Sequence, residues 1–326
     1  MGAEPGRSLL TFRPGTNTAF SSLKQINAGV LNVGYAAAGP EDGPAVLLLH
    51  GFPYDIHSFV DVAPLLGAAG YRVIVPHLRG HGTTRFLSNA TFRNGQQAAV
   101  ALDIIALMDA LRIDQAILAG YDWGSRTANI VAALWPKRCK GMVSVNGYLI
   151  NNLELNKRPL PPRVEWGLWY QYYFATDRGK AGLEANRREL AKIIWRFNSP
   201  KWAFDDATFD RTALSFDNPD YVSIVVHNYR WRLSLAAGEA RYNDLERRLA
   251  EVPTINTPTV TLDGDSDGVA PATDGSAYAS RFAGKRTPRI VKGAGHNLPQ
   301  EAPQAFVDAV VEVAGYAGVQ ARSARR

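Results

Sequence analysis

The sequence GYDWGS, residues 120–125, decides how the rest of the chain is interpreted. An apolar run at residues 115–119 precedes it, and a helical pattern follows it as far as Pro136. This order predicts a strand, a sharp turn and a helix, because the glycines allow a tight turn that projects one side chain into a cleft. That side chain is Asp122, where the commoner Gly-x-Ser-x-Gly motif has serine. A carboxylate here predicts attack on an sp3 carbon, which makes an ester that water must then cleave.

The composition bounds the class of protein. The 326 residues are enough for one large domain or for a domain with an insertion. Cys139 is the single cysteine, which excludes an intrachain disulfide and is consistent with a reducing compartment. The net charge of +6 comes from scattered basic residues apart from the tail 322–326, so we expect no nucleic-acid partner. Residues 1–25 show no signal peptide and no stretch resembles a membrane span, so we expect a cytoplasmic protein without membrane attachment.

Short apolar runs alternate with amphipathic helical patterns on both sides of the turn. Strands are expected at 30–37, 45–49, 71–76, 115–119, 141–146, 259–263 and 289–292, and helices at 61–69, 96–111 and 303–313. Alternating buried strands and helices predict an α/β fold whose mostly parallel sheet is covered by helices on both faces. Ligands then bind at the carboxyl ends of the strands.

Residues 150–250 have a different character. They contain five of the seven tryptophans and helical patterns without strand-like runs. We expect a helical insertion that lies over the strand ends as a lid and forms the wall of a mostly apolar pocket. The expected division is an N-terminal arm at 1–25, a core domain at 26–148 and 251–316, a helical cap at 149–250 and a basic tail at 317–326.

An aspartate nucleophile requires a base that activates water and an acid that orients the base. His296 fits the base, because small residues in GAGHNL precede it just after the strand expected at 289–292. Three acids follow the preceding strand, namely Asp263, Asp265 and Asp267. We expect Asp267 to orient the histidine and the other two to form hydrogen bonds within the turn.

The sequence HGFP, residues 50–53, follows another expected strand. The backbone N–H groups of Phe52 and Trp123 are expected to form an oxyanion hole for the tetrahedral intermediate of ester hydrolysis. Such a donor contributes about 3–4 kcal/mol. His50 is expected to pack this loop rather than to act in catalysis.

The order of these motifs resembles the α/β-hydrolase superfamily and, within it, the soluble epoxide hydrolases. The resemblance covers about residues 27–314 and includes a cap insertion at the expected place. It implies that Asp122 opens an epoxide and that His296 activates the water that releases a vicinal diol. It also implies a small epoxide and water as partners, a monomer or homodimer, and no cofactor or metal. The aromatic-rich lid leads us to expect that the epoxide is apolar.

Epoxide hydrolases use two lid tyrosines to hold the epoxide oxygen and protonate it. The segment LWYQYYF resembles their first tyrosine segment and gives this role to Tyr170, with Tyr172 and Tyr173 as alternatives. The segment HNYR resembles the second and gives the partner role to Tyr229. An epoxide requires such acids because its leaving alkoxide is strongly basic, whereas a halide leaves as a stable anion.

Other interpretations of the same motifs remain. Haloalkane dehalogenases share the Asp-Trp elbow, but Phe52 cannot donate a side-chain hydrogen bond where many of them have asparagine or glutamate. Fluoroacetate dehalogenases have arginine in place of Trp123 and an acid in place of Asn146, although Arg126 matches their second arginine. A non-catalytic ligand receptor is less expected because the triad is complete. The expected substrate pocket includes Trp123, Phe52 and Gln171.

Overall fold

The computed structural model describes residue 20 and residues 22–319. In this part of the chain a nine-stranded sheet has the order β1-β2-β4-β3-β6-β7-β8-β9, with β5 paired to β2. The pairs that involve β2 are antiparallel, and the pairs from β4 through β9 are parallel. The strands are β1 (Lys24–Ala28), β2 (Leu31–Ala38), β3 (Ala45–Leu49), β4 (Arg72–Pro76), β5 (Arg85–Phe86), β6 (Ala116–Gly120), β7 (Cys139–Val145), β8 (Thr259–Gly264) and β9 (Arg286–Val291).

Helices cover both faces of the sheet. Helices α2 and α3 pack together on one face, whereas α1 and α12 pack together on the other. The core helices are α1 (Val62–Ala68), α2 (Gln97–Ala110), α3 (Trp123–Leu134), α11 (Leu298–Glu301) and α12 (Pro303–Tyr316). The central strands are therefore buried on both faces, and every residue of β6 is buried. This explains why β6 is a continuous apolar run rather than an alternating one.

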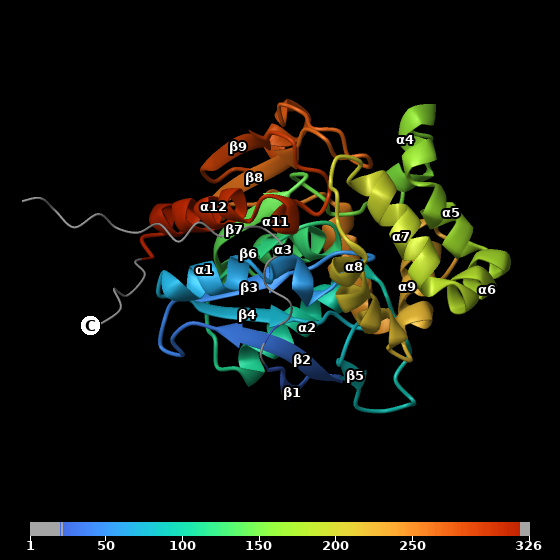
Figure 1. Cartoon of the computed structure of the whole chain (residues 1–326), viewed down its shortest axis with the longest axis horizontal. Helices are drawn as coiled ribbons and strands as arrows, with labels where there is room; N and C mark the ends of the chain where they lie inside the picture. Colours follow the sequence, from blue (N-terminus) through green and yellow to red (C-terminus); the bar gives the residue numbers. More distant parts are fainter. Residues whose placement is uncertain (1–19, 21, 320–326) are drawn as a thin grey trace, which may run out of the picture.

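A group of helices lies to one side of the sheet and follows β7 in the chain (Figure 1). It comprises α4 (Pro162–Gly167), α5 (Trp169–Ala175), α6 (Asp177–Ala185), α7 (Arg187–Asn198), α8 (Asp206–Ala213), α9 (Tyr221–Arg232) and α10 (Asn243–Ala250). Its helices are packed around buried aromatic side chains, among which Trp195 and Phe174 are fully buried. We refer to residues 149–250 as the cap.

The sequence predicted the α/β class and the parallel sheet correctly, and each predicted strand is present with small shifts at its ends. It missed β1 and β5. Strand β1 begins at Lys24, inside the segment expected to be an arm, and its residues are mostly exposed at the edge of the sheet. An exposed edge strand needs no apolar run, so the pattern gave no signal. Residues 1–19 and 21 of the expected arm, and residues 320–326 of the expected tail, lie outside the described residues.

The cap is tied to the core at the beginning of α2. The carboxylate of Glu246, in α10, accepts a hydrogen bond from the backbone N–H of Ala98 at 3.0 Å. It also accepts hydrogen bonds from the side chains of Gln96 and Gln97. Free N–H groups at a helix N-terminus require such acceptors. One side chain of the cap thus provides the hydrogen-bond acceptor at the N-terminus of a core helix.

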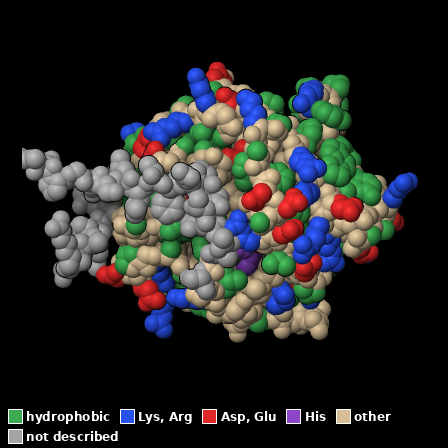
Figure 2. Space-filling model, viewed as in Figure 1, with side chains coloured by type: hydrophobic (Ala, Val, Ile, Leu, Met, Phe, Trp, Pro, Cys, Tyr) green, Lys and Arg blue, Asp and Glu red, His purple; other side chains and the backbone are tan. Residues whose placement is uncertain are grey.

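Lys and Arg side chains are intermixed with Asp and Glu on the face shown in Figure 2, and hydrophobic side chains gather over the outer cap helices. Three exposed members of this outer region are Leu160, Trp166 and Tyr172. Among the residues described, no helix combines the length and apolar character needed to cross a bilayer.

Candidate active site

The turn after β6 holds Asp122 in a rare backbone conformation, with φ 51° and ψ −121°. A non-glycine residue with positive φ is strained, and such strain is common where a side chain is presented for function. The turn is tight because Gly124 packs against β3. A Cβ atom on Gly124 would lie 1.9 Å from the carbonyl oxygen of Leu49. The glycine predicted to permit the turn is therefore required by contact with the neighbouring strand.

The loop after β3 lies directly beside the nucleophile, because β3 and β6 are parallel neighbours. The backbone N–H of Phe52 donates a hydrogen bond to Oδ1 of Asp122 at 2.7 Å. Trp123 is the first residue of α3, so its N–H has no acceptor within the helix. His50 is fully buried and packs the loop: its Nδ1 lies 3.0 Å from the Gly51 carbonyl oxygen, and its Nε2 accepts the backbone N–H of the residue at position 78.

His296 lies between two carboxylates. Its Nδ1 is 2.8 Å from Oδ2 of Asp267, and its Nε2 is 3.5 Å from Oδ2 of Asp122. The other oxygen of Asp267 accepts the backbone N–H groups of Val269 and Ala270. These bonds fix the carboxylate, so Nδ1 of the histidine is held as a donor and Nε2 faces the nucleophile.

The three candidate acids, of which Asp263 lies in β8 and the other two follow it, have separate contacts. Asp263 accepts a hydrogen bond from the Tyr278 hydroxyl at 3.2 Å, and Asp265 accepts the backbone N–H of Gly293 at 2.7 Å. Of the three, Asp267 is the one bonded to the histidine. The structure therefore brings Asp122, His296 and Asp267 together in the arrangement that the sequence predicted.

The charges in this group depend on one another. Burial alone would lower the pKa of His296, but the carboxylates of Asp267 and Asp122 outweigh burial and raise it to about 10. Burial would raise the pKa of Asp122, but the His296 imidazolium, Arg126 and the Phe52 N–H hold it below its usual range. The resting site is thus an ionised carboxylate beside a protonated histidine.

Sequence reasoning missed the residues that hold the histidine loop. The backbone N–H of His296 donates to the Asn198 carbonyl oxygen at 3.2 Å, at the end of cap helix α7. Next to it, the hydroxyl of Ser199 donates to Glu301 at 2.6 Å, and Glu301 in turn accepts the N–H of Gly295. The contacts of Asn198 and Ser199 join segments about one hundred residues apart, so no local pattern could reveal them.

Two cap tyrosines lie over the elbow. Tyr170 in α5 and Tyr229 in α9 are 3% and 1% exposed, and their ring centroids are 5.7 Å apart. The ring of Phe52 lies 6.1 Å from the first and 5.6 Å from the second. Burial and the nearby Asp122 carboxylate raise the pKa of Tyr170 to about 12. Burial, then Tyr170 and Asp122, raise the pKa of Tyr229 well above its usual value. Both phenols are therefore protonated donors at neutral pH.

The neighbouring tyrosines do not share this position. Tyr172 is 40% exposed, and its hydroxyl donates to Glu165 on the cap surface. The ring of Tyr173 packs against Trp169, with centroids 6.1 Å apart. Gln171 is buried, and its Nε2 lies 3.5 Å from the Tyr170 hydroxyl. The structure thus separates Tyr170 from the two alternatives that the sequence left open.

Comparison with known proteins places this architecture in a family. Residues 44–303 match the family model of the alpha/beta hydrolase fold. A solved structure of a candidate epoxide hydrolase from Klebsiella pneumoniae is 56% identical, with a TM-score of 0.89 over 91% of this chain and 99% of that one. The chain belongs to the α/β-hydrolase fold family.

More distant members agree with this assignment. Epoxide hydrolase B of Mycobacterium tuberculosis is 32% identical over 152 residues, which are 43% of this chain and 42% of that protein. The match therefore spans less than half of the curated relative's length. A candidate epoxide hydrolase from Pseudomonas aeruginosa has a TM-score of 0.75 over 92% of this chain and 97% of its own, at 20% identity, which shows likeness of fold.

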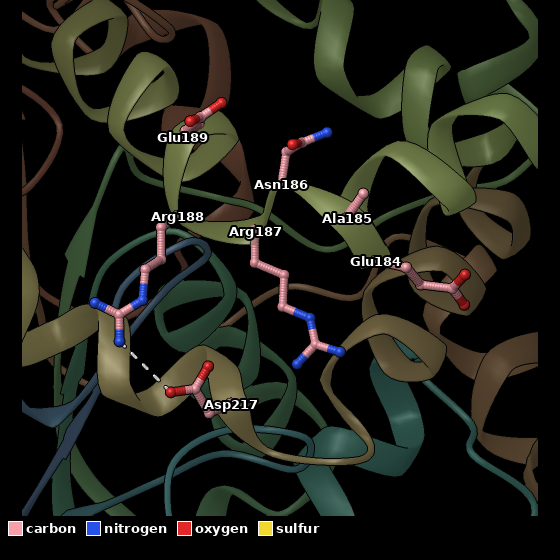
Figure 3. A pocket seen from close by; sticks show the side chains of 7 residues that line it. All are labelled: Glu184, Ala185, Asn186, Arg187, Arg188, Glu189 and Asp217. Carbon is pink, nitrogen blue, oxygen red and sulfur yellow. Dashed lines mark ion pairs between the residues drawn. The ribbon is translucent and has the colours of Figure 1, made fainter.

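This α/β hydrolase also has a polar pocket away from the elbow, between α6, α7 and the turn after α8 (Figure 3). It is lined by Glu184, Ala185, Asn186, Arg187, Arg188, Glu189 and Asp217. The side chains of Arg188 and Asp217 form an ion pair at 3.5 Å and are both well exposed. None of the residues predicted for catalysis lines this pocket, so we place the chemistry at Asp122.

Proposed function

We propose that this chain is an epoxide hydrolase that converts an epoxide to a vicinal diol through an ester on Asp122. The observation that carries the proposal is the pair of buried, protonated phenols of Tyr170 and Tyr229 over an ionised carboxylate nucleophile. An epoxide requires both a nucleophile and an acid at the same place. The 56% identical candidate epoxide hydrolase from Klebsiella pneumoniae supports the same conclusion.

In the first step, Oδ2 of Asp122 attacks the less hindered epoxide carbon, because Oδ1 is held by the Phe52 N–H. The carbon–oxygen bond of the ring breaks, and a phenol of Tyr170 or Tyr229 gives its proton to the leaving oxygen. The resulting phenolate recovers a proton from the His296 imidazolium through solvent. Ring opening therefore consumes the proton that the resting histidine holds.

In the second step, His296 acts as the base, and formation of the ester on Asp122 prepares it for this role. Once Asp122 is a neutral ester, the carboxylate that helped to raise the pKa of His296 is gone, so the imidazole becomes neutral more readily. Its Nε2 takes a proton from water, and the hydroxide attacks the ester carbonyl. The N–H groups of Phe52 and Trp123 hold the oxyanion, and the ester then breaks to release the diol and restore the carboxylate.

The domain division and the location belong to this proposal as well. A core at 26–148 and 251–316 supplies the ester chemistry, and a cap at 149–250 supplies the acids. The absence of a metal or organic cofactor, the cytoplasmic location and a monomer or homodimer remain our expectations from the sequence.

The covalent step is the most direct test. The His296→Ala variant should form the ester and fail to cleave it, so its intact mass should rise by the mass of the whole epoxide. Peptide mapping should place that mass on Asp122, and an Asp122→Asn, His296→Ala double variant should gain nothing. An unmodified His296→Ala protein after exposure to several epoxides would refute the proposal.

A haloalkane dehalogenase with the same triad is the second candidate, and one observation favours it. Within the described residues, the buried indole N–H of Trp123 has no hydrogen-bond partner and could bind a halide. The neighbouring Phe52 supplies no second side-chain donor. The same His296→Ala experiment separates the two reactions, because a haloalkane adds only its alkyl group to Asp122.

A further inference from the structure

One arginine of the elbow helix is buried next to the nucleophile. The backbone N–H of Arg126 bonds to the carbonyl oxygen of Asp122 at 3.0 Å, one turn into α3, and the residue is 7% exposed. Its Nε donates to the Leu149 carbonyl oxygen at 3.1 Å. Neither terminal nitrogen has a hydrogen bond or a carboxylate partner among the residues that the structure describes. The charged end of this side chain is therefore unpaired beside the reacting group.

A second arginine approaches from the cap. Arg232 is the last residue of α9, one turn after Tyr229, and its Cζ lies 5.8 Å from that tyrosine's ring centroid. Its Nε is buried, and no described residue accepts a hydrogen bond from it. Burial and the charge of Arg232 lower the pKa of Arg126 to about 9. Two cations thus face the same region and repel each other.

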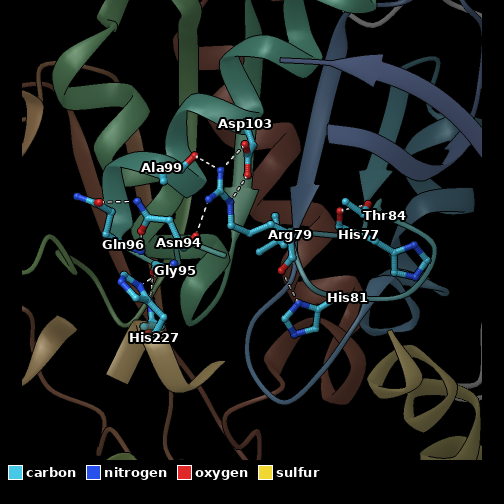
Figure 4. A network of polar contacts seen from close by, with 12 residues as sticks. His77, Arg79, His81, Thr84, Asn94, Gly95, Gln96, Ala99, Asp103 and His227 are labelled. Atoms are coloured by element: carbon cyan, nitrogen blue, oxygen red, sulfur yellow. Dashed lines mark hydrogen bonds and ion pairs between the residues drawn. The ribbon is translucent and has the colours of Figure 1, made fainter. Parts of the chain in front are cut away.

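The chain also contains a buried arginine whose guanidinium has a carboxylate partner, and it differs in this respect from Arg126 (Figure 4). Arg79 is 2% exposed, and its Nε and Nη2 bond both oxygens of Asp103 at 2.6 and 2.7 Å. Its remaining N–H groups donate to carbonyl oxygens of residues 94 and 99. Although burial opposes its charge, the Asp103 carboxylate raises the pKa of Arg79. A buried guanidinium normally requires such a partner.

The charges around the nucleophile leave an excess of one positive charge. Asp122 and Asp267 are negative and His296 is positive, so the triad carries one net negative charge in the resting state. Arg126 and Arg232 add two positive charges. Ring opening makes Asp122 a neutral ester and consumes the proton of His296, so the excess stays at one positive charge. A ligand with one negative charge would therefore neutralise the site both before and after ring opening.

We propose that the substrate carries a carboxylate close to its reacting carbon, and that Arg126 and Arg232 bind this carboxylate while Tyr170 and Tyr229 hold the epoxide oxygen. Two guanidinium groups suit a planar anion with two oxygens. That the reacting group is an epoxide rests on the function proposed above, whereas the anion site rests on the arginines alone. The inference replaces the apolar substrate expected from the aromatic cap with a small epoxy acid.

The test uses ligands that differ only in charge. Binding of 2,3-dihydroxybutanoate, which cannot react, is compared by calorimetry with binding of 2,3-dihydroxybutanamide. The wild-type protein should bind the acid at least about tenfold more tightly, as expected for a desolvated charge pair. Arg126→Gln and Arg232→Gln should each remove most of this preference, and Arg126→Lys should retain part of it. Arg230→Gln is the matched control, because Arg230 pairs with Asp177 on the cap surface.

Turnover of the corresponding epoxides then separates the two proposals. Equal affinity for the acid and the amide, or a preference that survives both glutamine variants, would overturn the anion site even if neutral epoxides are hydrolysed. A charge preference that depends on the arginines, without hydrolysis or ester formation from any epoxide, would support the anion site and refute the epoxide hydrolase. If a glutamine variant fails to fold, the other variant and Arg126→Lys still measure the charge dependence.

Discussion

Removing the phenol hydroxyls should slow ring opening and leave ester hydrolysis intact. Tyr170→Phe and Tyr229→Phe each delete one proton donor while the aromatic packing around Phe52 remains. General acid catalysis contributes about 10²–10⁴-fold to a rate. Because either variant retains one donor, we expect each to slow alkylation about 10- to 100-fold, which corresponds to about 1.4–2.7 kcal/mol in the barrier. The double variant should lose most of the full contribution.

The assay should isolate the first step. In the His296→Ala background the ester accumulates, so quenched samples analysed by intact mass give the rate of alkylation directly. Tyr172→Phe is the control, since its hydroxyl bonds Glu165 at the surface. The hydroxyl of Tyr229 has no hydrogen-bond partner in the described part of the chain, so its loss should change the unfolding free energy little. A double variant that alkylates at a near-normal rate would show that the phenols are not the acids.

Three further predictions concern the triad and the elbow. Asp267→Asn should slow ester hydrolysis about 10²–10⁴-fold and make the ester detectable by mass in an otherwise intact protein; hydrolysis at the normal rate would contradict the orienting role. Gly124→Ala should destabilise the fold by about 3 kcal/mol or more in urea unfolding, because its Cβ would overlap the Leu49 carbonyl oxygen; an unchanged midpoint would show that the strand does not require glycine here. The raised pKa of His296 stabilises the fold fully below its unfolded pKa near 6.5, and this contribution is lost as the pH rises through about 10. The stability difference between wild type and His296→Gln should therefore shrink from pH 6.5 to pH 10, and a growing difference would refute the assigned charge state.

The sequence was informative where a local pattern and a physical requirement coincide. Buried parallel strands must be apolar on both faces, so they stand out as short runs, and the candidate catalytic residues follow at their carboxyl ends. Asp122 and His296 could therefore be found from the sequence alone. The choice of Asp267 over Asp263 and Asp265 depended on its place in the turn, and the structure shows the hydrogen bond that distinguishes it.

The sequence was uninformative where contacts join distant segments. Glu246 bonds the beginning of α2 across about 150 residues, and Ser199 bonds Glu301 across about 100. The sequence also cannot show that the Arg126 guanidinium lacks a carboxylate partner, because this depends on where the Asp and Glu side chains lie in the folded chain. The sequence indicated only that Arg126 matches the second arginine of fluoroacetate dehalogenases, which did not show that its guanidinium lacks a carboxylate partner in this chain.

The site is divided between two parts of the chain, with a consequence for how its specificity could change. Asp122, His296 and Asp267 belong to the sheet domain, whereas both phenols project from cap helices. In the proposed mechanism, ester cleavage uses the first group and the oxyanion hole of the sheet domain, whereas the second group protonates the leaving oxygen. Exchanging the cap among relatives should therefore alter which bond is broken, while the ester-hydrolysis step stays the same. New activities can then arise by recombination of one segment, without changes to the triad.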